Sequence, residues 1–222
     1  MLDSIREAAS RLAENRCDGS SVERGMLYHD LPFPELSGMA AHRRGNRHRF
    51  RLMASRYDFK GKSGVDLGCS VGGLSFRLAL AGAKMVGVDY DPAAIGVADA
   101  VREWRLSIGD SVVAENTSFI CGDVAEFPVP ECDFCIWLSV FMWVWKLHGR
   151  DAALAKLAEV SQRCDVLFFD TASGKGDGMA GDVVDMTPEQ ILARSGYANV
   201  VRLGVPRGRW FRRPLFMCWG RE

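Results

Sequence analysis

The chain lacks a net charge that would direct it to a polyanion. Its 222 residues contain 28 lysines and arginines against 28 aspartates and glutamates. A strong excess of one sign would favour nucleic acid or a charged membrane surface through long-range attraction. Binding of an anion must therefore depend on local clusters of basic residues, and we expect no DNA partner.

The sequence also lacks a membrane-spanning run and an export signal. Its longest apolar run covers residues 134–145, which is too short to cross a bilayer, and it ends at Lys146. The N-terminal residues 1–7 carry charges where a signal peptide needs an apolar core. We expect a cytoplasmic protein that does not bind membranes.

Cysteine spacing provides no framework for a metal or for disulfides. The seven cysteines are an odd number scattered along the chain. Cys132 and Cys135 form one Cys-x-x-Cys pair, but residues three apart on a strand point to opposite faces, and no second pair or histidine cluster accompanies them. We expect reduced thiols, no disulfide and no metal site.

A glycine turn between two apolar runs is the most informative feature that is present. Residues 65–73 read as a strand followed by a turn with Gly68 and Gly72, and residues 84–89 read as a second strand that ends at Asp89. The acid follows the turn by about twenty residues, where a Rossmann-like unit places its ribose-binding carboxylate. This pattern predicts half of a nucleotide-binding α/β unit.

Two details of the turn disfavour a dinucleotide. The full Gly-x-Gly-x-x-Gly pattern is absent, because Gly68 is followed by Cys69 and Ser70. Asp66 ends the first strand and would direct negative charge to the place where a pyrophosphate would lie. An NAD-dependent oxidoreductase is therefore a distant alternative, and the turn suits a cationic ligand.

Four motifs resemble those of class I S-adenosylmethionine (SAM) dependent methyltransferases, and together they cover residues 60–170. Asp66-x-Gly68-x-Ser70-x-Gly72 resembles the first motif, with Ser70 at a position that is usually glycine. Asp89-Tyr90 resembles the second, residues 122–124 the third and residues 132–140 the fourth. The resemblance implies SAM as cofactor and S-adenosylhomocysteine (SAH) as product.

The resemblance also assigns roles to residues. Asp89 would bind both ribose hydroxyls, Asp123 would contact the adenine amino group, and the strand that ends near Leu138 would face the methyl group. The cofactor-binding residues implied in this way are Asp66, Gly68, Cys69, Ser70, Gly72, Asp89, Tyr90, Asp123, Val124 and Leu138.

Periodicity and resemblance together predict the fold as one domain, residues 1–222. Apolar runs predict strands near residues 64–67, 84–89, 117–121, 132–139 and 165–170, alternating with helices near 73–82, 92–106 and 150–162. Helices over 2–16 and 40–55 precede them, and two strands, 199–205 and 214–219, follow. The family's three-layer α/β/α sandwich has seven strands in the order 3-2-1-4-5-7-6, with the last strand antiparallel. Residues 1–60 would form an extension over the acceptor side of the core, residues 61–222.

Two arginine clusters are the candidates for binding an acceptor. The first lies within residues 43–51 and the second within residues 202–213. If both border the acceptor opening, they would favour a phosphate or a carboxylate, for which the arginine fork is well suited. An equally weighted alternative is that they only solvate two surfaces. The candidate substrate-binding residues are Arg43, Arg47, Trp143, Arg207 and Arg209.

Residues after the fourth strand provide the candidates for catalysis. His148 is the best candidate for a general base, which only a hydroxyl acceptor would need, and His29 is a second. Trp143 and Trp145 would line the acceptor pocket, while Trp137 and Phe141 would pack in the core. The glycine-rich segment 170–178 is either a flap near the acceptor or a surface loop.

The acceptor stays open at the level of sequence. Residues 138–151 are similar to a stretch in enzymes that methylate terminal phosphates on RNA ends or polysaccharides, and residues 28–32 faintly resemble the lead-in of methyltransferases related to the tRNA wobble-uridine carboxymethyl-transfer enzymes. No Asn/Asp-Pro-Pro-aromatic signature of amine methylation follows the fourth strand. We predict methyl transfer to an oxygen or anionic group of a small-molecule, glycan or nucleotide-like acceptor. The alternatives are an RNA methyltransferase and a SAM-binding regulatory subunit without chemistry of its own.

Overall fold

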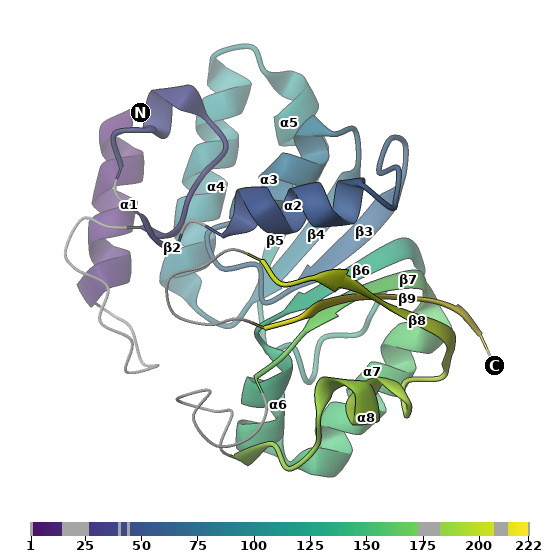
Figure 1. Ribbon diagram of the computed structural model, residues 1–222. Coiled ribbons are helices and arrows are strands. Elements are labelled where there is room, and N and C mark those ends of the chain that lie inside the picture. The colour runs from purple at the N-terminus through teal and green to yellow at the C-terminus, as the bar shows by residue number, and fades with distance from the viewer. Residues whose placement is uncertain are drawn as a thin grey trace.

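A computed structural model describes residues 2–14, 27–39, 41–43, 45–172, 183–206 and 213–221 (Figure 1). Its centre is a seven-stranded sheet with the order β5-β4-β3-β6-β7-β9-β8. The strands are β3 (Ser63–Leu67), β4 (Lys84–Asp89), β5 (Thr117–Cys121), β6 (Cys132–Leu138), β7 (Cys164–Asp170), β8 (Tyr197–Gly204) and β9 (Leu215–Arg221).

The order and directions of these strands confirm the predicted topology. The five strands from β5 through β4, β3 and β6 to β7 pair in parallel with one another, while β9 is antiparallel to both β7 and β8. Numbered from β3 as strand 1, the order is the predicted 3-2-1-4-5-7-6. The carboxyl ends of the parallel strands therefore meet at one edge, where an open α/β sheet binds its ligands.

Helices cover both faces of the sheet, which confirms the three predicted layers. One face carries α2 (Asn46–Ala54), α3 (Gly73–Leu80), α4 (Pro92–Ser107) and α5 (Ser111–Glu115); the other carries α6 (Phe141–His148), α7 (Arg150–Arg163) and α8 (Pro188–Leu192). β6 shows why both faces are needed. Phe134 and Ile136 pack with the helices of the first face, whereas Cys135 and Trp137 pack with those of the second.

The N-terminal residues add a layer to the first face. Helix α1 (Leu2–Glu14) buries Ile5, Ala9 and Leu12, which share a face at helical spacing, in the same cluster as Val97 and Val101 of α4. After it, β1 (Leu27–His29) pairs in parallel with β2 (Ala41–Arg43), and the short 3-10 helix η1 (Pro34–Leu36) connects them.

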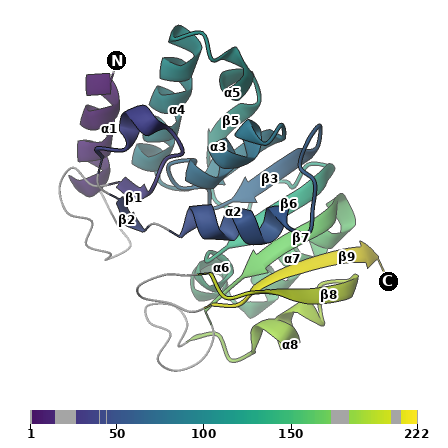
Figure 2. The same cartoon turned by 45° about the horizontal axis from the view of Figure 1, so that its top comes forward.

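The helix predicted over residues 40–55 is wrong in its first part. Residues 41–43 form β2 instead, and α2 begins only at Asn46. The physical reason is a pairing partner about fourteen residues earlier in the chain, β1, which a local periodicity cannot register. From Asn46, α2 lies across the first face of the sheet between α3 and β8 (Figure 2).

The apolar run 134–145 is divided between a strand and a helix. β6 ends at Leu138, Ser139 adopts a left-handed φ of 61°, and α6 begins at Phe141. Trp137 and Phe141 are fully buried in the core, as predicted, but Trp145 is buried there too, so its predicted place in an acceptor pocket is wrong. Within the described ranges, no helix is both long and apolar enough to cross a membrane.

Candidate cofactor and acceptor site

The turn after β3 is held to the end of β4 by backbone hydrogen bonds. The amides of Gly68 and Cys69 both donate to the carbonyl of Val88, at 2.8 and 3.0 Å, and the amide of Ser70 donates to Asp89 Oδ2 at 2.8 Å. Ser70 has a φ of 51°, and Gly68 and Gly72 have φ of 86° and 74°. The turn is therefore fixed against Asp89, the residue predicted to bind ribose.

The glycines of this turn permit close packing between segments. A Cβ atom at Gly68 would lie 2.2 Å from Val140 Cγ2, and one at Gly73 would lie 2.7 Å from the carbonyl oxygen of Asp30. The turn after β3 therefore contacts the start of α6 on one side and the N-terminal extension on the other. Cys69 is buried beside Gly87 and serves this packing, and burial raises the pKa of its thiol.

Asp89 orders the backbone before and after the carboxyl end of β4. Its Oδ2 accepts the amide of Ser70 and its Oδ1 accepts the amide of Asp91 at 3.1 Å. Tyr90 follows it with an exposed side chain, and Asp91 caps α4 through the amides of Ala93 and Ala94.

Asp66 is more deeply buried than its predicted role implies. It is 4% exposed, and its Oδ2 accepts the hydroxyl of Ser75 at 2.7 Å. Burial raises the pKa of Asp66 to about 7, while the hydrogen bond from Ser75 and the charge of Arg49 act in the opposite direction. The carboxylate of Asp66 is thus held inside the fold, against Ser75 of α3.

Asp123 and His148 were predicted to serve different ligands, yet they contact each other. The two atoms His148 Nε2 and Asp123 Oδ2 lie 2.8 Å apart, and Asp123 Oδ1 accepts the amide of Ala125 at 2.8 Å. Val124, which follows Asp123 in sequence, is buried. His148, the predicted base, therefore lies beside the carboxylate that the resemblance assigns to adenine.

The ends of β6 and β7 carry a network that connects three segments of the chain. Arg49 Nη2 on α2 donates to Ser139 Oγ and to Asp170 Oδ2, both at 2.8 Å. Ser139 Oγ donates to Asp170 Oδ1 at 2.7 Å, and the amide of Ser139 donates to the carbonyl of Asp170 at 3.0 Å. The side chain of Asp170 is completely buried, and that of Arg49 is 16% exposed.

The sequence grouped the arginines of α2 without singling out Arg49. Arg47 and Arg51, which share one face of α2, are exposed. Asn46, Arg49 and Met53 instead lie on the inward face, at the i, i+3, i+7 spacing of a buried stripe. An arginine inside such a stripe is the signal that would have identified it.

The other predicted substrate-binding residues are only partly described. Arg47 points outward on α2, and Trp143 is partly buried on α6, with Lys146 Nζ 5.3 Å from the centre of its ring. The side chain of Arg43 and the whole of Arg207 and Arg209 lie outside the described residues, as does the predicted flap after Ala172.

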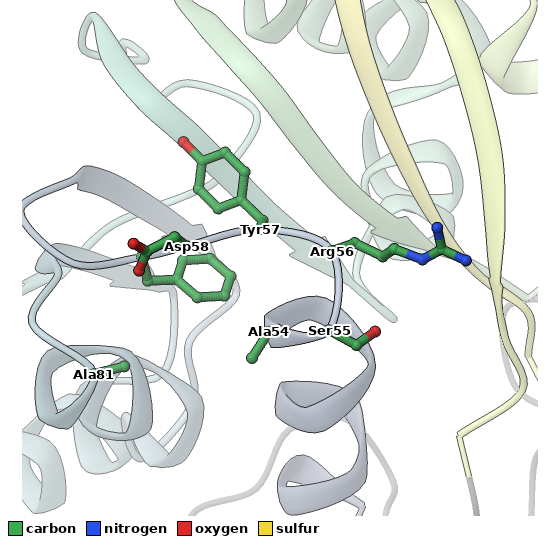
Figure 3. Close-up of a pocket in the computed structure, with 7 residues that line it drawn as sticks. Ala54, Ser55, Arg56, Tyr57, Asp58 and Ala81 are labelled. Atoms are coloured by element: carbon green, nitrogen blue, oxygen red, sulfur yellow. The ribbon is translucent and has the colours of Figure 1, made fainter.

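A depression of about 490 Å³ lies at the opposite edge of the sheet from these groups (Figure 3). It is lined by the end of α2, the connection to β3 and the end of α3, that is, by residues at the amino ends of the strands: Ala54, Ser55, Arg56, Tyr57, Asp58, Phe59 and Ala81. In Figure 3, Arg56 points away from Asp58 and Ala81. The chemistry-bearing residues thus gather at the other edge.

The residues at the carboxyl edge fit SAM better than a dinucleotide. Three carboxylates, those of Asp66, Asp89 and Asp123, follow or end β3, β4 and β5, where a diphosphate would be repelled. A sulfonium and an ammonium group would instead be attracted there. Asp89 provides the acceptors that ribose hydroxyls need. In the part of the chain that the structure describes, no cluster of His, Cys, Asp and Glu has the make-up of a metal site.

Comparisons with known proteins give the same result. Residues 65–163 match the model of a methyltransferase domain. The chain is 33% identical over 138 residues to the O-antigen chain terminator bifunctional methyltransferase/kinase WbdD of Escherichia coli. The aligned region covers 58% of this chain and 19% of that protein. The chain is also 28% identical to a probable histone-arginine methyltransferase 1.4 of Arabidopsis thaliana, over 53% of this chain and 21% of that one. The chain thus spans about a fifth of the length of these curated relatives.

Solved structures show the same fold. A crystal structure of WbdD superposes with a TM-score of 0.74 and 24% identity, covering 89% of this chain and 45% of that one. Magnesium protoporphyrin IX methyltransferase from Synechocystis PCC 6803 with bound SAM gives a TM-score of 0.58 and 23% identity, covering 77% and 75%. The match over residues 65–163, the sheet order and the turn after β3 together identify a methyltransferase domain with the class I SAM-dependent methyltransferase fold.

Proposed function

We propose that the protein transfers the methyl group of SAM to an oxygen or anionic group of a small-molecule, glycan or nucleotide-like acceptor. The observation that carries this proposal is the division of charge along the carboxyl edge of the sheet. Carboxylates border the ends of β3, β4 and β5, whereas at the ends of β6 and β7 the carboxylate of Asp170 is paired with Arg49. A cationic cofactor would occupy the first half and an anionic acceptor the second.

The cofactor would supply the methyl group and its own leaving group. The chain then has to align the acceptor oxygen, the methyl carbon and the sulfur, and such alignment can contribute roughly 7–11 kcal/mol to the lowering of the barrier. Asp89 would bind the ribose, Asp123 with the backbone of Val124 the adenine, and Asp66 would favour the positive charge near the turn after β3. Gly68, Ser70 and Gly72 would let the backbone follow the cofactor closely.

An anionic acceptor is favoured over a hydroxyl because of His148. A hydroxyl must lose a proton during transfer, and the proposed base for it is His148. Its Nε2 is 2.8 Å from Asp123, however, at the adenine side of the proposed site. A phosphate or carboxylate oxygen is already deprotonated near neutral pH and needs no base.

The relatives support a sugar-linked acceptor as one form of this proposal. WbdD is named as an O-antigen chain terminator that is both a methyltransferase and a kinase, and it matches this chain at 33% identity. We also propose that residues 1–60 border the acceptor, since Arg49 and Asp30 both approach the carboxyl edge from this extension. Arg43, Arg47, Trp143, Arg207 and Arg209 remain proposed acceptor contacts.

The second candidate function is methylation of RNA. The specific observation in its favour is the exposure of Arg47 and Arg51 on the outer face of α2, where they could follow a phosphate backbone. Binding of RNA would then weaken steeply as salt is added. A SAM-binding subunit without its own chemistry is the alternative of another class, and turnover by the isolated chain would exclude it.

Calorimetric titration of SAM, SAH and NADH into the purified protein tests the proposal. We expect SAM and SAH to bind and NADH not to bind. Asp89→Ala should weaken SAH by about a hundredfold or more, because hydrogen bonds to a charged group contribute about 1.5–3 kcal/mol each. Asp58→Ala, an exposed acid at the other edge of the sheet, is the matched control and should bind SAH as the wild type does. A folded protein that binds neither adenosyl ligand would overturn the proposal.

A further inference from the structure

We infer that Arg49 is an anion-binding residue of the ligand site, positioned by Asp170 and Ser139, and that its ligand is a carboxylate or phosphate oxygen. The inference deepens the proposed function and rests on it for the nature of the ligands. Two sources share this chemistry: the carboxylate of the cofactor's amino-acid tail, and the anionic group of the acceptor.

The position of Arg49 is fixed by both of its neighbours in the network. Nη2 donates one hydrogen bond to Ser139 and one to Asp170, so both of its hydrogens are used. Asp170 is fully buried and also accepts the hydroxyl of Ser139. A guanidinium held by two partners in this way has lost most of its rotamer freedom before any ligand binds, and this favours tight binding of one geometry.

Three donors of the guanidinium are left over. Arginine has five N–H groups, and those on Nη1 and Nε have no hydrogen-bond partner among the residues that the structure describes. The side chain is 16% exposed, so these donors are at the edge of accessible space rather than sealed in the core. The N–H groups on Nη1 and Nε point in different directions, and each can donate a charge-assisted hydrogen bond to an oxygen of a carboxylate or phosphate.

The location of the network is that of the reacting groups. Ser139 follows the end of β6, the strand next to β3, and Asp170 ends β7, the strand beyond it. Ser139 directly precedes Val140, which packs against Gly68 of the turn. The charge of Arg49 also acts on Asp66 at the end of β3. An anion that binds Arg49 would therefore lie between the turn after β3 and the ends of β6 and β7.

A purely structural role explains less of this arrangement. An arginine that served only to neutralise Asp170 would need no free donors at an accessible edge. Buried ion pairs of that kind are also often no more stable than apolar residues of the same size. The network does explain why Ser139 has a φ of 61°: the turn of the chain directs its hydroxyl at both partners.

Two cofactor analogues separate the two sources of the anion. SAH has the amino-acid tail and its carboxylate, whereas 5′-methylthioadenosine lacks the whole tail. Both are titrated calorimetrically into wild type, Arg49→Met and the control Arg56→Met, which removes an exposed arginine at the far end of the same segment. Inorganic phosphate, titrated into the SAH complex of each protein, serves as the probe for the acceptor anion.

We expect Arg49→Met to lower the affinity for either SAH or phosphate by at least about tenfold. If the variant binds SAH more weakly but binds 5′-methylthioadenosine as the wild type does, the anion that Arg49 binds is the carboxylate of the cofactor. If the variant binds SAH as the wild type does but binds phosphate more weakly, the anion that Arg49 binds is that of the acceptor. Wild-type affinity of Arg49→Met for both SAH and phosphate would overturn the inference.

A second measurement detects binding in the wild-type protein and uses a variant, Arg49→Lys, which keeps the positive charge, only to assign a resonance. In wild-type protein labelled with ¹⁵N-arginine, the Nε–H resonance of Arg49, identified by its absence in Arg49→Lys, should shift on addition of the anion that it binds. A resonance that moves with neither SAH nor phosphate contradicts the inference. Failure of the wild type to bind SAH would instead overturn the proposed function, while phosphate titrated into the free protein would still test Arg49.

Discussion

His148 Nε2 lies 2.8 Å from Asp123 Oδ2, so the histidine proposed for proton transfer is joined to the carboxylate proposed for adenine. Both side chains are partly exposed, at 29% and 40%, and the pair should therefore contribute little to stability. The pair should instead orient the carboxylate of Asp123, so its loss should change the affinity for the cofactor.

His148→Ala should therefore weaken the binding of SAH by about twofold to tenfold, because Asp123 loses one of the two contacts that orient it. His148→Gln, whose amide can donate to the same oxygen, should retain nearly wild-type affinity. Calorimetric titration measures both. If His148→Ala binds SAH normally but turnover falls by about a hundredfold or more, His148 acts on the acceptor as a base instead.

Gly68→Ala should abolish SAH binding. The new methyl group would lie 2.2 Å from Val140 Cγ2, so the turn after β3 and the start of α6 would have to separate. Gly61→Ala is the matched control, since Gly61 also has a positive φ of 74° but has nothing within 4 Å of an added Cβ. It should cost only about 1–2 kcal/mol, from backbone strain, and leave binding intact. Equal loss of binding in both variants would show that strain alone is responsible.

Asp66 should make the protein without cofactor less stable as pH rises from about 4 to about 7. Burial raises the pKa of this carboxyl from 3.8 to about 7 in the folded state, so the folded chain holds a proton that the unfolded chain has released. The loss should be on the order of a few kcal/mol. Urea unfolding at pH 5 and pH 8 measures it, and Asp66→Asn should reduce the difference. An unchanged difference in Asp66→Asn would assign the pH dependence to other groups.

Arg49 and Asp170 should show strong coupling in a double-mutant cycle. Arg49→Met leaves a buried, unpaired carboxylate and should cost about 3–5 kcal/mol of stability. Adding Asp170→Asn to that variant should recover part of the loss, because no charge is then left unpaired. Arg163→Met removes an exposed pair with Glu131 and should cost less than about 1 kcal/mol. Additive effects of the two changes at Arg49 and Asp170 would contradict the coupling.

The sequence was sufficient for the parts of the fold that local patterns determine. β4 (Lys84–Asp89) and β5 (Thr117–Cys121) match their predicted ranges because each is a short β-rich run bounded by turn residues. Pro92 and Asp91 likewise mark the start of α4. The order of the strands followed from the family resemblance and not from periodicity.

The remaining features depend on contacts between distant residues. β2 exists because residues 27–29 pair with it, and α6 follows β6 because Ser139 turns the chain. Arg49 was missed for the same reason: its partners are 90 and 121 residues away in sequence. A charged residue on the inward face of a helix becomes meaningful only when the strands that it reaches are known.

The pairing of β6 with β7 has a consequence for how much of the chain must be expressed. The recognisable domain ends at residue 163, just before β7 begins at Cys164. A fragment cut there would leave β6, buried from Phe134 to Leu138, as an open edge strand with unpaired amides and carbonyls. Such edges join to other chains and aggregate. The matched domain, residues 65–163, is therefore smaller than the unit that can fold.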